Sequence, residues 1–174
     1  MATTSQVRLD AARGIFPSAK KGQTVDQAEL DRLGIKEAIR QARLSLDQGG
    51  IPIGAALMRG EELLGSGHNQ RVQLRNPILH GETDCLQNAG RIGSYKGTTI
   101  YSTLMPCAMC AGTIVLFKIP RVVVGEASSF PGEREWLQSR GVEVIDLQLP
   151  ECAGMMKAFI EANPELWAED IGEL

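Results

Sequence analysis

The sequence contains no run of about 18 apolar residues, the length that a membrane-spanning helix requires. Its first residues, MATTSQVRLDAARG, hold no apolar core of the kind found in secretory signals. It also shows no internal repeat and no low-complexity block. We therefore expect no membrane association and a cytoplasmic location.

Positive charge is not in excess. The 174 residues include 18 Lys and Arg against 21 Asp and Glu, and the formal net charge at pH 7 is −3. A protein that binds nucleic acid needs a basic face for the phosphates, so this balance argues against nucleic acid as a partner. Apolar residues make up 43% of the chain, which is enough for the buried core of one domain.

Cysteine is also sparse, with Cys85, Cys107, Cys110 and Cys152 only. Disulfides are not expected in a reducing compartment. Cys107 and Cys110 form a Cys-x-x-Cys pair, which occurs in redox couples, in metal sites and by coincidence. The residues around the pair therefore decide its meaning.

The spacing of apolar residues and the positions of Gly and Pro predict alternating helices and strands. Helices are expected from Asp26 to the Gly49-Gly50 pair and over residues 80–89, 106–117, 133–140 and 151–162, and strands over 51–58, 63–67, 98–104, 121–125 and 142–147. Strand–helix–strand units require right-handed crossovers and a sheet covered on both faces. We therefore predict an α/β fold, a three-layer α/β/α sandwich around a mixed sheet of about five strands.

The first 25 residues differ from the rest because they are polar and have no periodic pattern. We expect residues 1–25 to form a loosely attached N-terminal arm. Residues 26–174 are expected to fold as one domain.

Two short motifs carry the chemistry. His80-Gly81-Glu82 stands at one predicted helix start, and Pro106-Cys107-Ala108-Met109-Cys110 stands at another. Cys107 and Cys110 are three residues apart and share one face of their helix, where the helix N-terminus favours the thiolate form. Together with His80 they supply three zinc ligands, and three protein ligands leave the fourth position open to water, as in catalytic zinc sites.

Glu82 lies two residues after His80 and is placed to reach the metal-bound water. Zinc lowers the pKa of that water towards neutrality, and a neighbouring carboxylate can take its proton and return it to a leaving amine. His-x-Glu combined with Pro-Cys-x-x-Cys is the signature of zinc deaminases, in which the Glu is the general acid and base. The sequence predicts a zinc hydrolase that removes an amine from a nucleobase-like ring.

Two other interpretations remain open at this point. Cys107 and Cys110 are also compatible with a thioredoxin-like redox pair, although the upstream His-x-Glu then has no explanation. A purely structural zinc site needs a fourth protein ligand, for which His68 and Cys85 are the candidates.

The stretch from His80 to Cys110 resembles the cytidine-deaminase-like superfamily and, more narrowly, the fungal-type cytosine deaminases. The narrower resemblance covers most of the chain, from Gly50 onwards. It rests on Ile51-Pro-Ile-Gly, Gly67-His-Asn, Pro120-Arg-Val-Val-Val-Gly-Glu, Leu137-Gln-Ser-Arg-Gly and Trp167-Ala-Glu-Asp-Ile-Gly-Glu. It implies deamination of free cytosine to uracil, a reaction of pyrimidine salvage, by a homodimer with one zinc ion per subunit.

The resemblance also implies roles for the residues around the ring and a C-terminal segment that closes the pocket. Asn69 and the backbone N–H of Gly81 would bind the polar edge of the ring, Asp170 would accept a hydrogen bond from the amine that leaves, and Ile53, Phe130 and Trp167 would enclose the base. An amide offers both a donor and an acceptor, and a carboxylate repels a carbonyl at the amine position. Simpler structural interpretations make Asn69 a turn residue, Phe130 part of the core, Trp167 an anchor and Asp170 a surface acid.

Some residues depart from the pattern expected for the fungal-type enzymes. They are Met105, the Asp84-Cys85 pair and Gln87, and we expect them near the rim of the pocket. The identity of the substrate ring therefore remains undecided between cytosine and another aminoheterocycle, such as guanine, another aminopurine or an amino-s-triazine. Deamination within tRNA would need a basic rim, and a zinc or redox module without enzymatic activity is the remaining alternative.

Overall fold

The computed structural model describes residues 25–173. The predicted N-terminal arm, apart from Val25, therefore lies outside the described residues. The helices are α2 (Gln27–Asp47), α3 (Arg71–Leu74), α4 (Gly81–Ala89), α5 (Ala108–Phe117), α6 (Arg134–Ser139), α7 (Pro150–Ala162) and α8 (Pro164–Ile171), and the strands are β1 (Gly54–Arg59), β2 (Glu62–His68), β3 (Thr99–Leu104), β4 (Arg121–Glu126) and β5 (Glu143–Asp146). None of the helices in this part of the chain is long and apolar enough to cross a membrane.

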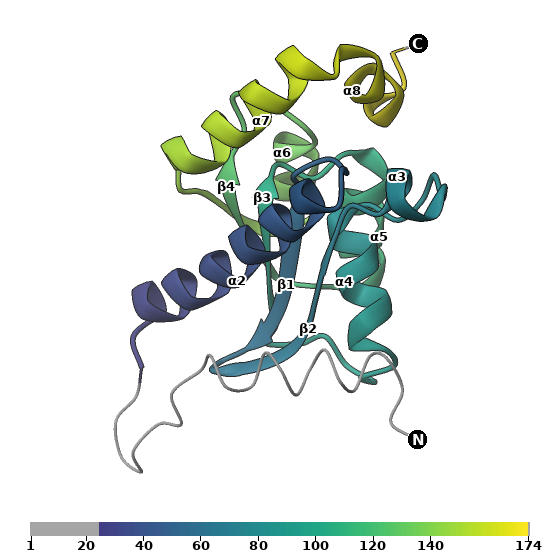
Figure 1. Ribbon diagram of the computed structural model, residues 1–174. Coiled ribbons are helices and arrows are strands. Elements are labelled where there is room, and N and C mark those ends of the chain that lie inside the picture. Colours follow the sequence, from purple (N-terminus) through teal and green to yellow (C-terminus); the bar gives the residue numbers. More distant parts are fainter. Residues whose placement is uncertain (1–24, 174) are drawn as a thin grey trace, which may run out of the picture.

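The five strands form one mixed sheet in the order β2-β1-β3-β4-β5. β1 is antiparallel to both β2 and β3, whereas β3, β4 and β5 run parallel. β1 and β2 form a hairpin, and the predicted mixed sheet is confirmed (Figure 1).

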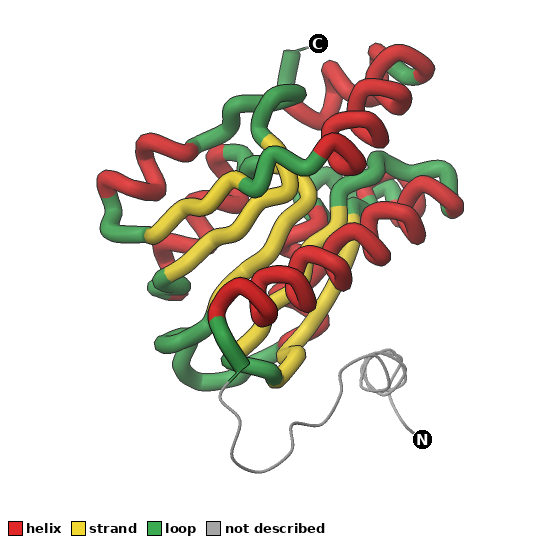
Figure 2. The backbone as a smooth tube through the Cα atoms, turned by 90° about the vertical axis from the view of Figure 1, so that its left-hand side faces the viewer, coloured by secondary structure: helices red, strands yellow, loops and turns green. Residues whose placement is uncertain are grey.

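Helices cover both faces of the sheet, as Figure 2 shows. Because side chains alternate along a strand, successive residues of β1 enter different cores. Ala56 and Met58 pack with Tyr101, Val123 and the α2 residues Leu33, Ile35 and Ala38. Ala55 and Leu57 pack with Cys85 and Leu86 of α4, Ala111 and Ile114 of α5 and Leu137 of α6. The three-layer α/β/α architecture is therefore confirmed.

α2 begins and ends where the sequence predicts. The Asp26 side chain accepts a hydrogen bond of 2.9 Å from the backbone N–H of Glu29, which satisfies one of the free donors at the helix start. The Glu29 side chain forms an ion pair with Arg32. The helix stops before Gly49, whose φ of +78° suits glycine.

Three segments differ from the prediction, and one of them is the unpredicted single-turn helix α3. β1 begins at Gly54 and not at Ile51, since Pro52 has no N–H to donate to a strand ladder. The C-terminal tail forms the unpredicted helix α8, with Pro164 in its first turn, a position that proline favours.

A third apolar cluster lies beyond the sheet end where β3 finishes. It joins Ile51 and Ile53 before β1, Leu104 at the end of β3, Met156 and Phe159 of α7 and Trp167 of α8. α7 and α8 lie together at this end of the molecule (Figure 1). Open α/β sheets bind ligands at the carboxyl ends of their parallel strands, and the two predicted motifs meet at this end.

Candidate active site

The ends of two helices bring the metal-binding motifs together. His80 and Cys107 are the N-cap residues of α4 and α5, both with extended backbone, and neither side chain caps its own helix. The side chains turn towards each other, and 3.6 Å separates Cys107 Sγ from His80 Nδ1. Cys110 follows on the inward face of α5 and is buried.

These three residues fit a zinc ion. Their ligand atoms all lie within 4.8 Å of one another. A tetrahedral zinc ion holds nitrogen at about 2.0 Å and sulfur at about 2.3 Å, which separates two such ligands by about 3.6 Å. The distance between Cys107 Sγ and His80 Nδ1 is also 3.6 Å. One imidazole and two sulfurs are a donor set that zinc favours.

The ionisation of one of the three groups also suits a cation. The pKa of the Cys107 thiol is lowered to about 4, above all by the hydrogen bond from the Cys110 thiol and, against the effect of burial, by its hydrogen bond with His80. The same contact, together with burial, raises the pKa of Cys110. Burial lowers the pKa of His80, but the hydrogen bond with Cys107 and the charge of Asp170 outweigh it and raise that pKa. Cys107 is therefore a thiolate at neutral pH, and the thiolate is the form of cysteine that binds metals.

Glu82 lies beside this group in the first turn of α4 and is only 3% exposed. Its Oε1 accepts a hydrogen bond of 2.9 Å from Ser102 Oγ on β3. Burial raises the pKa of Glu82, and the negative charge of Cys107 raises it further. A carboxyl group with a raised pKa can hold a proton between two transfers, as a general acid and base must.

The two alternative fourth ligands have other partners. The ring nitrogens of His68 lie 3.0 Å from Gln41 Oε1 and 3.1 Å from Gln48 Oε1. The Cys85 thiol lies in the core and donates a hydrogen bond to the Gly65 carbonyl. The potential metal-binding group contains neither residue.

A small cavity of about 20 Å³ adjoins His80, Glu82 and Cys107. The other lining residues are Ile53, Leu104, Met105, Phe130, Trp167, Asp170 and Ile171. One water molecule needs roughly 10–15 Å³, so the cavity admits water but no six-membered ring. The Phe130 and Trp167 rings meet edge to face above it, with centroids 6.0 Å apart and planes at 86°. The structure thus brings together around one cavity Ile53, Phe130, Trp167 and Asp170, the residues to which the family resemblance assigns substrate contacts.

Asn69 and Asp170 form the polar side of the site. Asn69 is fully buried, and its Nδ2 donates a hydrogen bond of 3.0 Å to Asp170 Oδ1. The same carboxylate oxygen lies 3.7 Å from His80 Nε2. Gly81, at the start of α4, lies against the Ile53 carbonyl, which would be 3.1 Å from an added Cβ. The close approach favours glycine at this position.

The departures from the family pattern do not gather at the rim, so that expectation is wrong. Asp84 is buried behind the site, where it accepts hydrogen bonds from the His68 N–H at 3.0 Å and from Gln70 Nε2 at 2.9 Å. Gln87 lines a separate surface cleft, and Cys85 belongs to the core. Met105 alone reaches the cavity lining, because it follows β3 directly.

Arg71, Ser102, Leu104 and Ile171 are site residues that the sequence reasoning missed. Ser102 and Leu104 follow each other at alternate positions of β3, a periodicity that points both to the same face of the strand. Ile171 lies four residues after Trp167, a helical spacing that was visible in the sequence. Arg71 carried no such signal, because its partners lie about a hundred positions away.

The family follows from a match over the part of the chain that builds this site. Residues 28–126 match the family model described as the cytidine and deoxycytidylate deaminase zinc-binding region. The chain belongs to this deaminase family. The matched region includes both metal-binding motifs, and it ends at the last residue of β4.

Relatives within the deaminase family extend the similarity beyond that region. The chain is 47% identical over 146 residues to a cytosine deaminase of Candida albicans, covering 82% of this chain and 97% of the relative. It is 33% identical over 141 residues to a tRNA-specific adenosine deaminase of Bacillus subtilis, covering 74% and 88%. A guanine deaminase structure from Nitrosomonas europaea superposes with a TM-score of 0.67 at 17% identity over 87% of this chain and 91% of that chain. This structure supports the deaminase fold alone.

Proposed function

We propose that this protein is a zinc-dependent cytosine deaminase that converts the free base to uracil and ammonia. The observation that carries the proposal is a buried carboxylate, Glu82, beside a group of one imidazole and two thiols, at a small cavity that the Phe130 and Trp167 rings help to line. The 47% identity to a cytosine deaminase over nearly the whole length of that enzyme supports the choice of ring.

In the proposed reaction, His80, Cys107 and Cys110 hold the metal. Zinc, when bound, supplies a Lewis acid that makes water a nucleophile at neutral pH. Glu82 would take one proton from the attacking water and deliver it to the ring nitrogen. It would then take the proton of the added hydroxyl group and deliver it to the amine, so that the carbonyl forms and ammonia departs. Ser102 orients the Glu82 carboxylate through its hydrogen bond to Oε1.

The polar residues would select the ring. Asn69 offers both a donor and an acceptor to the amide edge of the base, and the Gly81 N–H adds a second donor. Asp170 would accept a hydrogen bond from the exocyclic amine and disfavour a carbonyl at that position. Phe130 and Trp167 would enclose the flat faces of the ring.

The C-terminal segment would act as the cover of the pocket. A cavity of about 20 Å³ has no room for a base, and Trp167, Asp170 and Ile171 of α8 form one of its walls. We propose that α8 moves outward to admit substrate and then returns. On this basis residues 26–174 are one deaminase domain with a C-terminal closing segment.

A substrate panel tests the function. Ammonia release from cytosine is expected to exceed release from cytidine, guanine, adenine and an amino-s-triazine by at least about tenfold in kcat/KM, because selection rests on paired buried polar groups. Turnover of another base in preference to cytosine would support the proposed deamination but show that cytosine is not the preferred substrate. Absence of ammonia from every compound with the zinc-loaded protein would sink the enzymatic proposal and favour a zinc or redox module.

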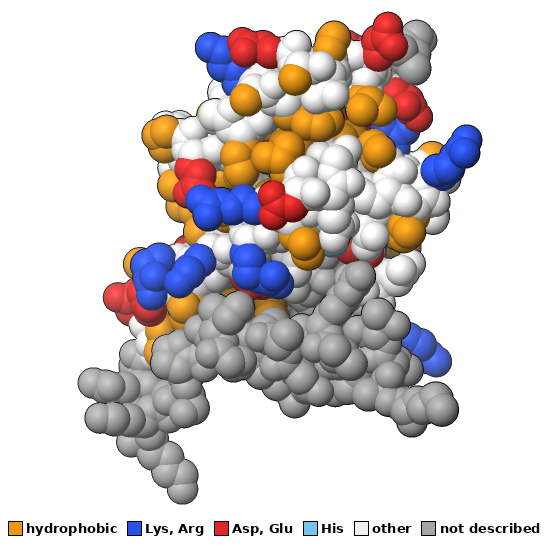
Figure 3. Space-filling model, in the orientation of Figure 1, with side chains coloured by type: hydrophobic (Ala, Val, Ile, Leu, Met, Phe, Trp, Pro, Cys, Tyr) orange, Lys and Arg blue, Asp and Glu red, His pale blue; other side chains and the backbone are white. Residues whose placement is uncertain are grey.

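Deamination within tRNA is the alternative that the Bacillus relative raises. Figure 3 shows Lys and Arg side chains gathered over α2. Three of these arginines are paired with carboxylates, in the pairs Arg32–Glu29, Arg40–Glu37 and Arg43–Glu151. Phosphate binding needs basic groups that are free to neutralise phosphates and so release the counterions of the nucleic acid. The proposed cover formed by α8 further disfavours a polynucleotide substrate.

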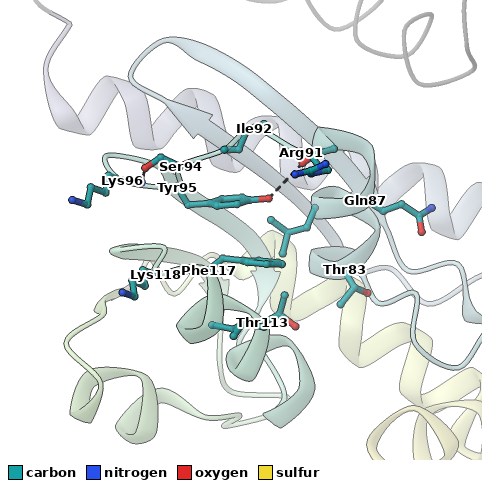
Figure 4. A pocket seen from close by; sticks show the side chains of 14 residues that line it. Thr83, Gln87, Arg91, Ile92, Ser94, Tyr95, Lys96, Thr113, Phe117 and Lys118 are labelled. Atoms are coloured by element: carbon teal, nitrogen blue, oxygen red, sulfur yellow. Dashed lines mark hydrogen bonds between the residues drawn. The ribbon is translucent and has the colours of Figure 1, made fainter.

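We also propose that two copies pair through the outer face of α5. A surface cleft of about 760 Å³ lies between α4, the 90–96 loop and α5 (Figure 4). Leu116 is 72% exposed and Phe117 40% exposed, and Phe117 stacks on Tyr95 with centroids 5.0 Å apart. A helix that is apolar on both faces is normally buried on both, so a second copy of the chain is the proposed cover, giving a homodimer with one zinc ion per subunit.

Leu116→Glu tests the dimer. The substitution is expected to weaken self-association at least roughly thirtyfold, the cost of losing a central apolar contact. Light scattering after size-exclusion chromatography measures the mass across a range of concentrations. Leu74→Glu is the matched control, because Leu74 is 57% exposed but lies on α3, outside the cleft. A wild-type protein that is monomeric at all concentrations contradicts the proposal.

The proposed compartment is the cytoplasm. Cys85, Cys107, Cys110 and Cys152 are all free thiols, and two of them must stay reduced to bind a metal. A reducing environment preserves that state. Conversion of cytosine to uracil there would serve pyrimidine salvage.

A further inference from the structure

Arg71 stands between the polar side of the site and α8. It is the first residue of the single-turn helix α3, and its side chain is 12% exposed. Its Nη1 donates a hydrogen bond of 3.0 Å to Asp170 Oδ1, and its Nη2 lies 3.3 Å from Glu169 Oε1. One guanidinium therefore holds two consecutive carboxylates of α8.

The backbone of the same residue orients Asn69. The Arg71 N–H donates a hydrogen bond of 3.1 Å to Asn69 Oδ1. This fixes which end of the amide is the acceptor, so Asn69 Nδ2 points to Asp170 Oδ1 at 3.0 Å. Both side chains predicted to make polar contacts with the ring, Asn69 and Asp170, are thus bound by a single residue that lies outside the cavity lining.

Asp170 is held by one oxygen only. Oδ1 accepts from Asn69 and Arg71, and the structure assigns no hydrogen bond to Oδ2 within residues 25–173. The arrangement leaves Oδ2 as the acceptor for a substrate amine. Arg71 determines that Oδ2 is the free acceptor, because a carboxylate that is hydrogen-bonded through Oδ1 cannot rotate freely.

The position of Arg71 also suits a latch. Arg71 and Glu169 line an outer cleft of about 360 Å³, whereas Asp170 lines the small cavity beside His80 and Glu82. The ion pairs therefore span the boundary between the two spaces. Arg71 Nε is buried without a hydrogen-bond partner among the described residues, a cost that is offset only while the Nη groups hold their carboxylates.

We propose that Arg71 is a positioning residue that latches α8 over the site and presents Asp170 to the leaving amine. The inference rests on the proposed deaminase function for its substrate, but the latch itself does not. Lysine cannot replace this arginine, because a point charge lacks the planar fork that reaches two carboxylates at once. Arg71 acts through Asp170 and α8 and not on the reacting atoms.

Kinetics of Arg71→Met test the proposal. KM for cytosine is expected to rise about tenfold or more, because a hydrogen bond to a charged group contributes about that factor, while kcat falls less and zinc content stays at the wild-type level. Arg71→Lys is expected to recover only part of the loss. Arg75→Met is the matched control and should match wild type, because Arg75 lies at the end of the same helix, lines the outer cleft and forms no ion pair within the described residues.

A double-mutant cycle separates positioning from a general structural role. If Arg71 acts through Asp170, Arg71→Met is expected to add less than about twofold in the Asp170→Asn background, since only independent effects multiply. An undiminished effect of Arg71→Met in that background, or a KM equal to wild type, overturns the proposal. Should Arg71→Met fail to fold, the same cycle is run with Arg71→Lys.

Hydrogen exchange of the α8 amides tests the latch without any substrate. Arg71→Met is expected to speed exchange in residues 164–171 about tenfold, because local opening then breaks fewer charged hydrogen bonds. Exchange in α2 serves as the internal control and should not change. A wild-type protein without deaminase activity would overturn the proposed function but leave this test intact, whereas unchanged α8 exchange would overturn the latch alone.

Discussion

Glu82→Gln is expected to lower kcat for deamination by about 10²–10⁴-fold while the protein still binds one zinc ion per chain. Glutamine has the size of glutamate and can still accept the hydrogen bond from Ser102, which is 2.9 Å long in the wild-type protein. It cannot take up a proton from water at neutral pH and return it to an amine. The loss should therefore appear in kcat and much less in KM.

The measurement pairs steady-state ammonia release with elemental analysis of the same sample. Glu37→Gln is the matched control, because Glu37 is also buried, at 2% exposed, but it lies on α2 and pairs with Arg40 away from the cavity. This control should keep wild-type turnover. A Glu82→Gln enzyme that remains fully active would remove Glu82 from the role of proton carrier.

Cys110→Ser is expected to lower bound zinc from one ion per chain to less than about a tenth, with a parallel loss of activity. A serine hydroxyl does not ionise at neutral pH and is a poor zinc ligand, so only His80 and Cys107 remain of the three ligands that zinc requires. Because a bound metal stabilises the folded state by mass action, the thermal midpoint of the zinc-loaded protein should also fall.

Elemental analysis and calorimetry with and without a chelator measure both effects. Cys152→Ser is the matched control, since Cys152 is a free thiol that is 1% exposed on α7 and lies outside the potential metal-binding group. Zinc retained at one ion per chain in Cys110→Ser would contradict the ligand set. A reversible Cys107–Cys110 disulfide in the wild-type protein would favour the redox interpretation.

The two sides of the site differ in how far they follow from local sequence. The metal side follows from short motifs, because His80 and Cys107 are N-caps and Glu82 and Cys110 lie in the first turns of the same helices. The few residues that start a helix set its N-cap. His80 and Glu82 are two positions apart on α4, and Cys107 and Cys110 three positions apart around the start of α5. When the N-termini of these two helices face each other, the ligand atoms lie close together, and no contact with a more distant segment is required.

The substrate side depends on packing between distant segments. Arg71 and Asp170 are separated by 99 positions, and the only signal for their contact would be the docking of α8. No helix is predicted after residue 162, although Pro164 and the spacing of Trp167 and Ile171 are compatible with the helix α8. The burial of that helix against Ile53 and Phe159 was not visible, because it depends on how the chain packs beyond the sheet.

The departures from the family pattern illustrate the same limit. Asp84 looked like a change near the pocket rim, but in the structure it is a buried acceptor for Gln70 and the His68 N–H. A side chain can be placed near a motif from sequence, whereas the direction in which it points follows from the neighbours that the fold supplies.

The sequence by itself determined the alternating α/β fold, the order of its strands along the chain, and the three metal-binding residues with Glu82 beside them, because these follow from periodicity, helix capping and spacing within short segments. Only the tertiary structure decided that a cavity of about 20 Å³ adjoins the metal-binding group, that the C-terminal segment forms α8 with Trp167, Asp170 and Ile171 in the cavity lining, and that Arg71 bonds to both Asn69 and Asp170. Such features arise from contacts between residues far apart in the chain, whose free energies depend on the packing of the whole domain.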